Sequence, residues 1–259
     1  RAFENDDIVH VSGKVSPIDD IEIINTELIL SDLSIVEKLY QKAQKNTKSG
    51  QKEGMPMKEL VEKILTALKE GTSLRKLTFG KEELVLLKNF QLLTLKPVLY
   101  VANVNESGFE NNPHLDLILD YATQDHSKVV PICAEIEAEI CELSNDEKKE
   151  FLLEMGQNES GLDRLIKAGY DLLGLHTYFT AGEKEVKAWT ITVGDSAPAA
   201  AGKIHTDFEK GFIRAETISF QDYITYKGEK GAKDAGKLRT EGKDYVVKDG
   251  DIMHFLHNT

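Results

Sequence analysis

The chain has 259 residues, of which 41% are hydrophobic, so it is long enough to bury the core of one large domain or of two to three smaller ones. Its 32 Lys and Arg residues against 44 Asp and Glu give a net charge of −12, which disfavours nucleic acid as a partner except at a local basic patch. Two cysteines are too few for a disulfide framework, and without an apolar run of roughly 18 residues we expect a cytoplasmic protein that makes no membrane contact.

Two helical patterns follow a short apolar run near the start of the chain. Residues 8–11 are rich in β-branched side chains, which predicts a strand end or an edge segment. Apolar residues at three- and four-residue steps then predict a helix over residues 17–45. After a polar loop at 46–54, the same spacing resumes over 56–71, where Gly71 is placed to end the helix. The pattern predicts an antiparallel helical hairpin, which either packs for structure alone or forms a partner-binding arm.

A strand–helix–strand unit is predicted in the middle of the chain. Residues 98–102 are apolar or aromatic without alternation, which predicts a strand buried on both faces of a parallel sheet. A helix is expected over 113–125 and a second strand over 129–132. Because ligands of α/β sheets sit outside the carboxyl ends of the strands, the polar residues after each strand either meet a ligand or merely cap and turn the chain. Asn103 follows the first strand and Glu135 lies beyond the second.

Helices continue to about Gly174, after which the pattern changes to short strands. Two acidic helices are expected over 136–142 and 146–155, and another from Gly161. We expect strands over residues 186–193, 211–220 and 246–253, and a short helix over 197–204. The Asp-Gly pair inside the last of these segments predicts a hairpin. The last part of the chain is therefore predicted to be a small α+β domain.

Two motifs bear on nucleotide binding. Residues 231–238 match the phosphate-loop pattern G-x-x-x-x-G-K-[ST] at every position but the last, where Leu238 cannot ligate Mg²⁺, so we take the match as coincidental. Asn-Val-Asn-Glu at residues 103–106 occupies the place where P-loop GTPases carry Asn-Lys-x-Asp, whose Asp pairs with guanine. The longer acid Glu106 and the missing Lys remove the basis for guanine preference, which makes adenine the plausible base.

Several longer stretches closely resemble the YchF family of Obg-like ATPases, and together they run the length of the chain. They are residues 1–11, 101–106, 108–113, 177–182, 205–216 and 249–255. The resemblance implies an α/β protein: a partial P-loop NTPase parallel sheet with an inserted antiparallel helical hairpin, plus a C-terminal TGS-like domain of the α+β, β-grasp type. Accordingly, residues 1–28 and 88–172 are assigned to the nucleotide-binding domain, 29–87 to the hairpin and 173–259 to the TGS-like domain.

The same resemblance implies a purine site formed by two loops. Asn103 would contact the adenine ring, with the backbone of Val104 at the base edge. The second loop is similar to the Ser-Ala-x loop that closes the base from the other side, with Cys133 in place of the serine and its hydroxyl. The implied base-site residues are Asn103, Val104, Asn105, Glu106, Cys133, Ala134 and Glu135.

Members of this family carry their phosphate loop and switch segments upstream of the stretch matched here. We therefore expect no phosphate, Mg²⁺ or catalytic residue within this sequence, and assign none. In the full-length form, ATP, with GTP a weaker ligand, would be bound and hydrolysed with Mg²⁺ by positioning and electrostatic stabilisation. The 259 residues alone are expected to be a catalytically inactive, monomeric fragment.

The TGS-like part is associated in the family with contact to RNA and the ribosome. Residues 227–248 carry a net charge of +3 in an acidic chain, and phosphate contacts by such a patch would depend strongly on salt. Lys233, Lys237 and Arg239 are the candidate contacts, with a solvated loop as the structural alternative. The rival function is a non-catalytic module that binds the ribosome, RNA or a protein through this domain and the hairpin.

Overall fold

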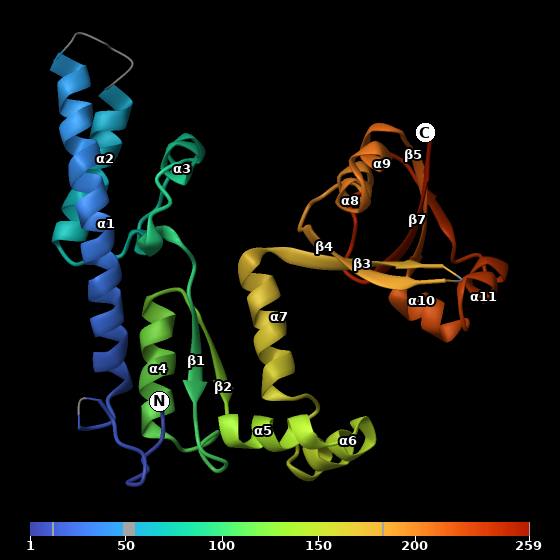
Figure 1. Cartoon of the computed structure of the whole chain (residues 1–259), viewed down its shortest axis with the longest axis horizontal. Coiled ribbons are helices and arrows are strands. Elements are labelled where there is room, and N and C mark those ends of the chain that lie inside the picture. The colour runs from blue at the N-terminus through green and yellow to red at the C-terminus, as the bar shows by residue number, and fades with distance from the viewer. Residues whose placement is uncertain (12, 49–54, 183, 259) are drawn as a thin grey trace. The chain divides into compact units, whose positions relative to one another are not determined.

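The computed structural model describes residues 1–11, 13–48, 55–182 and 184–258. The chain divides into two compact units, Arg1–Ala168 and Gly169–Thr259 (Figure 1). Within the described residues, every helix is too short or too polar to cross a membrane.

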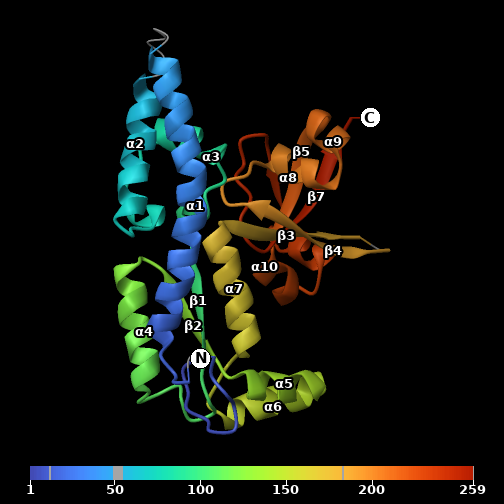
Figure 2. The same ribbon diagram turned by 60° about the vertical axis from the view of Figure 1, so that its left-hand side comes forward.

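Helices α1 (Pro17–Lys48) and α2 (Met55–Lys69) form the predicted antiparallel hairpin and lie side by side in Figures 1 and 2. Proline at the first helical position and acidic residues in the first turn suit the start of α1. Past the end of α2, Gly71 adopts a φ of 74°, the left-handed conformation that closes many helices. A polar loop was predicted over residues 46–54; residues 46–48 are instead helical, and residues 49–54 lie outside the described part of the chain.

The hairpin is held by an apolar core that also includes the segments leading back to the sheet. These segments are η2 (Leu74–Lys76), α3 (Lys81–Lys88) and η3 (Leu93–Leu95). The core residues are Ile29, Val36, Leu60, Val61, Ile64, Leu65, Ala67, Leu68, Leu74, Leu87 and Leu92. Asp32 of α1 is fully buried, and its carboxylate accepts hydrogen bonds from the first two backbone N–H groups of η3 at 2.8 and 2.7 Å. This contact links the long helix to the segment that enters the first strand.

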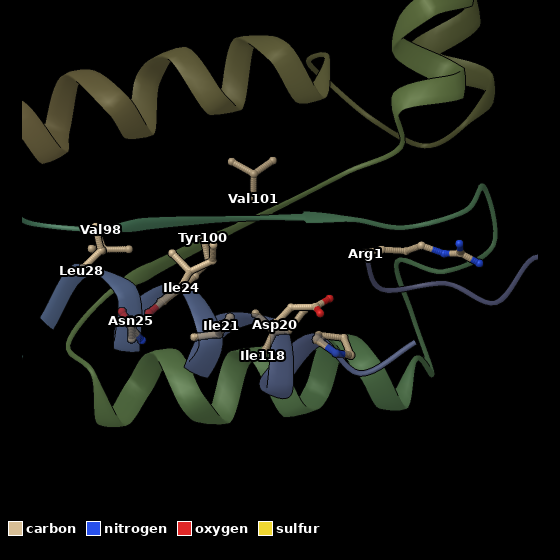
Figure 3. A pocket seen from close by; sticks show the side chains of 11 residues that line it. Arg1, Asp20, Ile21, Ile24, Asn25, Leu28, Val98, Tyr100, Val101 and Ile118 are labelled. Carbon is tan, nitrogen blue, oxygen red and sulfur yellow. The ribbon is translucent and has the colours of Figure 1, made fainter. Parts of the chain in front are cut away.

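Strand β1 (Leu99–Asn103), helix α4 (Pro113–Gln124) and strand β2 (Lys128–Ile132) confirm the strand–helix–strand unit, with the two strands parallel and paired over their full lengths. The prediction that β1 is buried on both faces is wrong, since Val101 is 43% exposed. Figure 3 shows the reason: Tyr100 points to the face covered by α1 and α4, whereas Val101 points to the opposite face. Strand pattern alone gave no information on whether both faces are covered.

Three further helices follow β2: α5 (Ala134–Glu142), α6 (Asn145–Glu154) and α7 (Gly161–Leu173). The boundary between the two units falls within α7.

The strand predicted at residues 8–11 is absent. None of the described segments pairs with these residues, and Val9 is 91% exposed. The core around β1 and β2 consists of Ala2, Ala102, Val104, Leu115, Ile118, Cys133, Ile136, Ile140 and Leu152.

The second unit is a five-stranded mixed sheet in the order β4-β3-β7-β5-β6, which confirms the predicted α+β class. Only β3 and β7 are parallel neighbours, near the middle of the sheet. The strands are β3 (Leu175–Ala181), β4 (Val186–Thr192), β5 (Phe212–Ser219), β6 (Arg239–Glu241) and β7 (Asp251–His257). The helices are α8 (Ala197–Ile204), α9 (Thr206–Lys210), α10 (Phe220–Thr225) and α11 (Glu229–Asp234).

The predicted hairpin around Asp249 and Gly250 is wrong. The pair does form a turn, with Gly250 at a φ of 78°. However, Val246 bridges to Ser196, while β7 beyond the turn pairs with β3 and β5. The segments before and after the turn therefore pair with different parts of the chain and not with each other. Of the phosphate-loop-like residues 231–238, the first four lie in the short helix α11 and not in a loop that precedes a helix, which is consistent with a coincidental match.

Candidate nucleotide-base site

The carboxyl ends of β1 and β2 meet at one edge of the sheet, as the strand–helix–strand pattern requires. Asn103 ends β1 and is in register with Ile132 at the end of β2. Its side-chain Oδ1 accepts a hydrogen bond from the Ala134 backbone N–H at 3.1 Å, and the Val104 N–H donates to the Ile132 carbonyl at 2.8 Å. The loops after the two strands are thus tied together, and both groups of predicted site residues lie side by side.

The first loop alternates between core and solvent. Val104 is 2% exposed and packs into the core, whereas Asn105 and Glu106 are exposed. The Gly108 N–H donates to the Asn105 carbonyl at 2.9 Å, and a Cβ at Gly108 would collide with the Asn105 side-chain oxygen. Glycine therefore allows the loop to fold back on itself. Val104 has only backbone to offer a base, while Asn105 and Glu106 have polar side chains in solvent.

The second loop offers backbone groups rather than the side chain of its first residue. Cys133 is 2% exposed in the core, and its thiol makes no capping hydrogen bond to α5. Ala134 and Glu135 are exposed in the first turn of α5, where backbone N–H groups have no partner inside the helix. Asn103 already accepts the Ala134 N–H. Glu135 is therefore the member of this loop with the most freedom to contact a ligand.

Asn112 organises the site, although sequence reasoning gave it no role. Its side-chain Nδ2 donates to the carbonyls of Ala2 and Gly108 at 2.8 and 2.9 Å. Its Oδ1 accepts from the N–H groups of His114 and Leu115 at 3.0 and 3.2 Å, which caps α4. One buried amide thus fixes the start of the chain, the base loop and a helix. An asparagine directly before a proline at a helix start was the available signal.

A buried ion pair between Arg75 and Asp125 lies against the side chain of Tyr100 in β1. Asp125, which is 2% exposed, accepts hydrogen bonds from Tyr100 Oη at 2.9 Å, Arg75 Nε at 3.1 Å and Ser127 Oγ at 3.0 Å. Lys76 Nζ lies 3.4 Å from the other carboxylate oxygen. Arg75 and Lys76 come from the base of the hairpin, Tyr100 from β1 and Asp125 from the end of α4. The cluster therefore connects the hairpin to the strand that carries Asn103.

This arrangement shifts the pKa of both Tyr100 and Asp125. Burial, together with the hydrogen bond to the carboxylate, raises the pKa of Tyr100 to about 12. Burial would raise the pKa of Asp125 too, but the hydrogen bonds from Tyr100 and Arg75 and the charge of Arg75 outweigh it and lower the pKa below its ordinary value. At neutral pH the cluster therefore consists of a neutral phenol, a carboxylate and two cations.

The sequence resemblance implies Mg²⁺ only for the full-length form. Among the described residues, His, Cys, Asp and Glu side chains nowhere gather in a group of three or more that suits a metal ion.

The chain is 59% identical over 258 residues to a protein named "Ribosome-binding ATPase YchF" from Escherichia coli O157:H7, an alignment that covers 100% of this chain and 71% of the relative. The chain belongs to the YchF family. The Bacillus subtilis (strain 168) protein of the same name is 51% identical over 261 residues, with the same shares of the two chains covered.

Two further comparisons agree with the assignment to the YchF family. Residues 175–258 match the family model YchF-GTPase_C, described as "Protein of unknown function (DUF933)". A solved structure, "Structure of the Schizosaccharomyces pombe YchF GTPase", superposes with a TM-score of 0.85 at 36% identity, covering 98% of this chain and 70% of that one. The predicted resemblance and fold class are therefore confirmed.

In this YchF-family chain, the candidate RNA patch of the second unit is smaller than the sequence suggested. Lys233 and Lys237 are exposed at the end of α11, and Lys237 Nζ lies 3.9 Å from Asp222. Arg239 instead has internal partners: its guanidinium lies 3.2 Å from Tyr245 Oη, 3.4 Å from the buried Asp251 and 3.3 Å from Glu241. Much of the charge of Arg239 is thus neutralised within the unit.

Two cavities occur in the described residues besides the base site. One, of about 270 Å³, runs beside β1 and is lined mainly by apolar side chains such as Ile24, Leu28 and Ile118, together with Arg1, Asp20 and Asn25 (Figure 3). The other, of about 580 Å³, lies in the second unit beside β7. None of the residues predicted for the base or the RNA patch lines either cavity. The apolar lining of the first suits hydrocarbon rather than phosphate.

Proposed function

We propose that this chain contributes the base-recognition half of an adenine-nucleotide site in a ribosome-binding ATPase of the YchF family. The observation that carries the proposal is the hydrogen bond between Asn103 and Ala134, which joins the two predicted base loops. It leaves Asn105, Glu106 and Glu135 in solvent beside the joined strand ends. The relatives named as ribosome-binding ATPases support the activity and the setting, cytoplasmic ribosomes.

Adenine is proposed over guanine because of the first loop. Glu106 places its carboxylate one methylene further out than the Asp of the GTPase motif. Val104, at the position of the motif's Lys, is buried and cannot lie along a base. Phosphate and Mg²⁺ would be held by parts of the longer relatives that align with no residue of this chain, which spans 71% of their length. On that basis we propose that these 259 residues bind the base but do not hydrolyse ATP.

Nucleoside titration tests base recognition separately from phosphate binding. Adenosine and guanosine are titrated into the chain and followed by NMR chemical shifts of the backbone amides. We expect adenosine to shift the signals of Asn105, Glu106 and Glu135 more strongly than guanosine does. Asn103→Ala should reduce these shifts markedly, because it removes both the proposed contact with the base and the hydrogen bond to the Ala134 N–H. Gln91→Ala, an exposed change in a distant loop, is the control. Stronger binding of guanosine, or unaltered shifts in Asn103→Ala, would refute the proposal.

The rival proposal, a non-catalytic ribosome- or RNA-binding module, is favoured by the exposed Lys233 and Lys237 of the second unit. In this proposal nucleotide acts only as a switch, and the protein binds through the second unit and the hairpin. Charge reversal at Lys233, Lys237 and Arg239 should then weaken co-sedimentation with 70S ribosomes. Co-sedimentation that is unchanged by the reversal would reject the patch and with it this rival.

A further inference from the structure

The outer end of the helical hairpin is strongly basic in an acidic protein. Residues 38–48, the last part of α1, contain four lysines and no acidic residue, a net charge of +4, so the remaining residues carry −16 between them. Figures 1 and 2 show that this end of α1 and α2 projects away from the strands β1 and β2. Such a local reversal of charge, at the tip of a projecting arm, creates a positive potential that the rest of the first unit lacks.

The described part of this region forms a regular stripe on α1. Lys38, Lys42 and Lys45 are four and three residues apart, which places them on one face of the helix within about 10 Å along its axis. All three side chains are exposed, and they form ion pairs with none of the described residues. By contrast, Lys63 of α2 is bound to Glu83 at 3.2 Å. We call these three residues the lysine stripe.

The chemistry of the lysine stripe fits a chain of phosphates. Ammonium groups are strongly hydrated point charges that bind phosphate without reading bases. Val36 and Ala43 of the same helix are buried, and the one large apolar side chain on the stripe's face, Ile35, is 38% exposed and lies a turn before Lys38. The stripe thus offers little apolar surface to enter a lipid layer, unlike a membrane-bound amphipathic helix. An RNA backbone therefore suits the stripe better than a membrane does.

We propose that the lysine stripe is an RNA-binding surface that contacts the sugar-phosphate backbone of ribosomal RNA, separate from the Lys233 and Lys237 patch. The ribosomal source of the RNA rests on the proposed function, whereas the RNA chemistry rests on the stripe itself. The contacts are independent of sequence and sensitive to salt. Three phosphate contacts would make the logarithm of the association constant fall with the logarithm of the salt concentration at a slope of about −2.7. Between 50 and 200 mM salt this corresponds to a loss of roughly 40-fold in affinity.

The test compares two triple charge reversals in the whole chain. The stripe variant is Lys38→Glu, Lys42→Glu and Lys45→Glu. The control variant reverses three other exposed lysines of the same unit that have no ion pair among the described residues: Lys81→Glu, Lys88→Glu and Lys96→Glu. Both variants change the net charge by the same amount, and both alter side chains with no described partner. Unaltered circular dichroism establishes that each variant folds.

Two RNA probes give separate readouts. Fluorescence anisotropy with a labelled 20-base-pair RNA duplex should show at least a tenfold rise in Kd and a shallower salt dependence for the stripe variant, and less than about a threefold change for the control. Co-sedimentation with purified 70S ribosomes should likewise weaken more for the stripe variant than for the control variant. Vesicles containing phosphatidylserine serve as the membrane probe, and neither variant should differ from wild type on them.

Each failure points to a different conclusion. Equal losses of duplex binding in the two variants, or no loss in the stripe variant, would overturn the proposal. A selective loss of vesicle binding in the stripe variant would assign the stripe to membranes and overturn it as well. If the wild-type chain does not sediment with ribosomes, the proposed ribosome association fails, while the duplex measurement still decides whether the stripe binds RNA.

Discussion

Neutralising Asp125 should destabilise the first unit more than any other single polar change at the base of the hairpin. The side chains of Asp125 and Arg75 are 0% and 6% exposed, and the carboxylate is the acceptor for Tyr100, Arg75 and Ser127. Asp125→Asn keeps the shape but leaves the buried guanidinium without a counter-charge. Breaking a buried pair in this way typically costs about 3–5 kcal/mol. Tyr100→Phe removes one hydrogen bond to a charged group and should cost about 1.5–3 kcal/mol.

Urea unfolding can separate this effect from the second unit. Far-UV circular dichroism follows the helices, which lie mostly in the first unit, whereas Trp189, the single tryptophan of the chain, lies in β4 and reports on the second unit. We expect Asp125→Asn to lower the far-UV midpoint and leave the Trp189 midpoint unchanged. The double variant Arg75→Met with Asp125→Leu should recover most of the loss, since no charge is left buried. A loss below about 1 kcal/mol for Asp125→Asn, or a double variant no more stable than the single one, would refute the reasoning.

Three further outcomes follow from the contacts. The pKa of Tyr100 is raised to about 12 in the folded chain, against a value near 10 in the unfolded chain. The stability that the protonated phenol gives the folded chain is therefore complete below about pH 10 and is lost as the pH rises through about 12. Urea midpoints between about pH 9 and 12 should fall less steeply in Tyr100→Phe, which has no phenol to ionise. Gly108→Ala would displace the Asn105 side chain and overpack the loop by about 1–3 kcal/mol, so adenosine titration should show weaker binding, and unchanged affinity would contradict the assigned geometry. Asp251→Asn replaces one of two carboxylate oxygens, which together accept from Tyr245 Oη at 2.7 Å and face Arg239 at 3.4 Å, by an NH2 group that can only donate. It should lower the stability followed by Trp189 fluorescence by about 1–3 kcal/mol while the far-UV transition of the first unit stays in place.

The elements that the sequence predicted well are those whose causes are local. The hairpin helices follow from spacing repeated over several turns, and from Gly71, whose positive φ ends α2. Where a segment depended on a partner, local pattern failed. Residues 8–11 have strand-forming side chains but no neighbouring strand among the described residues. Asp249 and Gly250 make their expected turn, yet β7 beyond it pairs with β3 and β5, far away in the chain. Such pairing is decided by the tertiary fold and not by the turn.

The same distinction applies to the base site. The meeting of Asn103 with the Cys133 loop was predictable, because the two strand ends of a parallel unit must share an edge. The ion pair between Arg75 and Asp125 joins residues 50 positions apart, and neither belongs to a pattern that names its partner. Asn112 is intermediate: its capping role is encoded locally, but its bond to the Ala2 carbonyl depends on how the start of the chain returns to the sheet.

The contacts around the candidate base site also bear on how a nucleotide would bind. Asn103 is fixed by Ala134, Asn105 is folded over Gly108, and Asn112 fixes the loop from beneath, all without a ligand. A site already shaped in this way needs little ordering when the base enters, so most of the base contacts can contribute to affinity. Phosphate binding in a longer relative would then add its own attraction rather than form the base pocket. The lysine stripe lies toward the outer end of the hairpin, away from β1 and β2, so RNA binding and base binding use different residues and can be measured separately in the same chain.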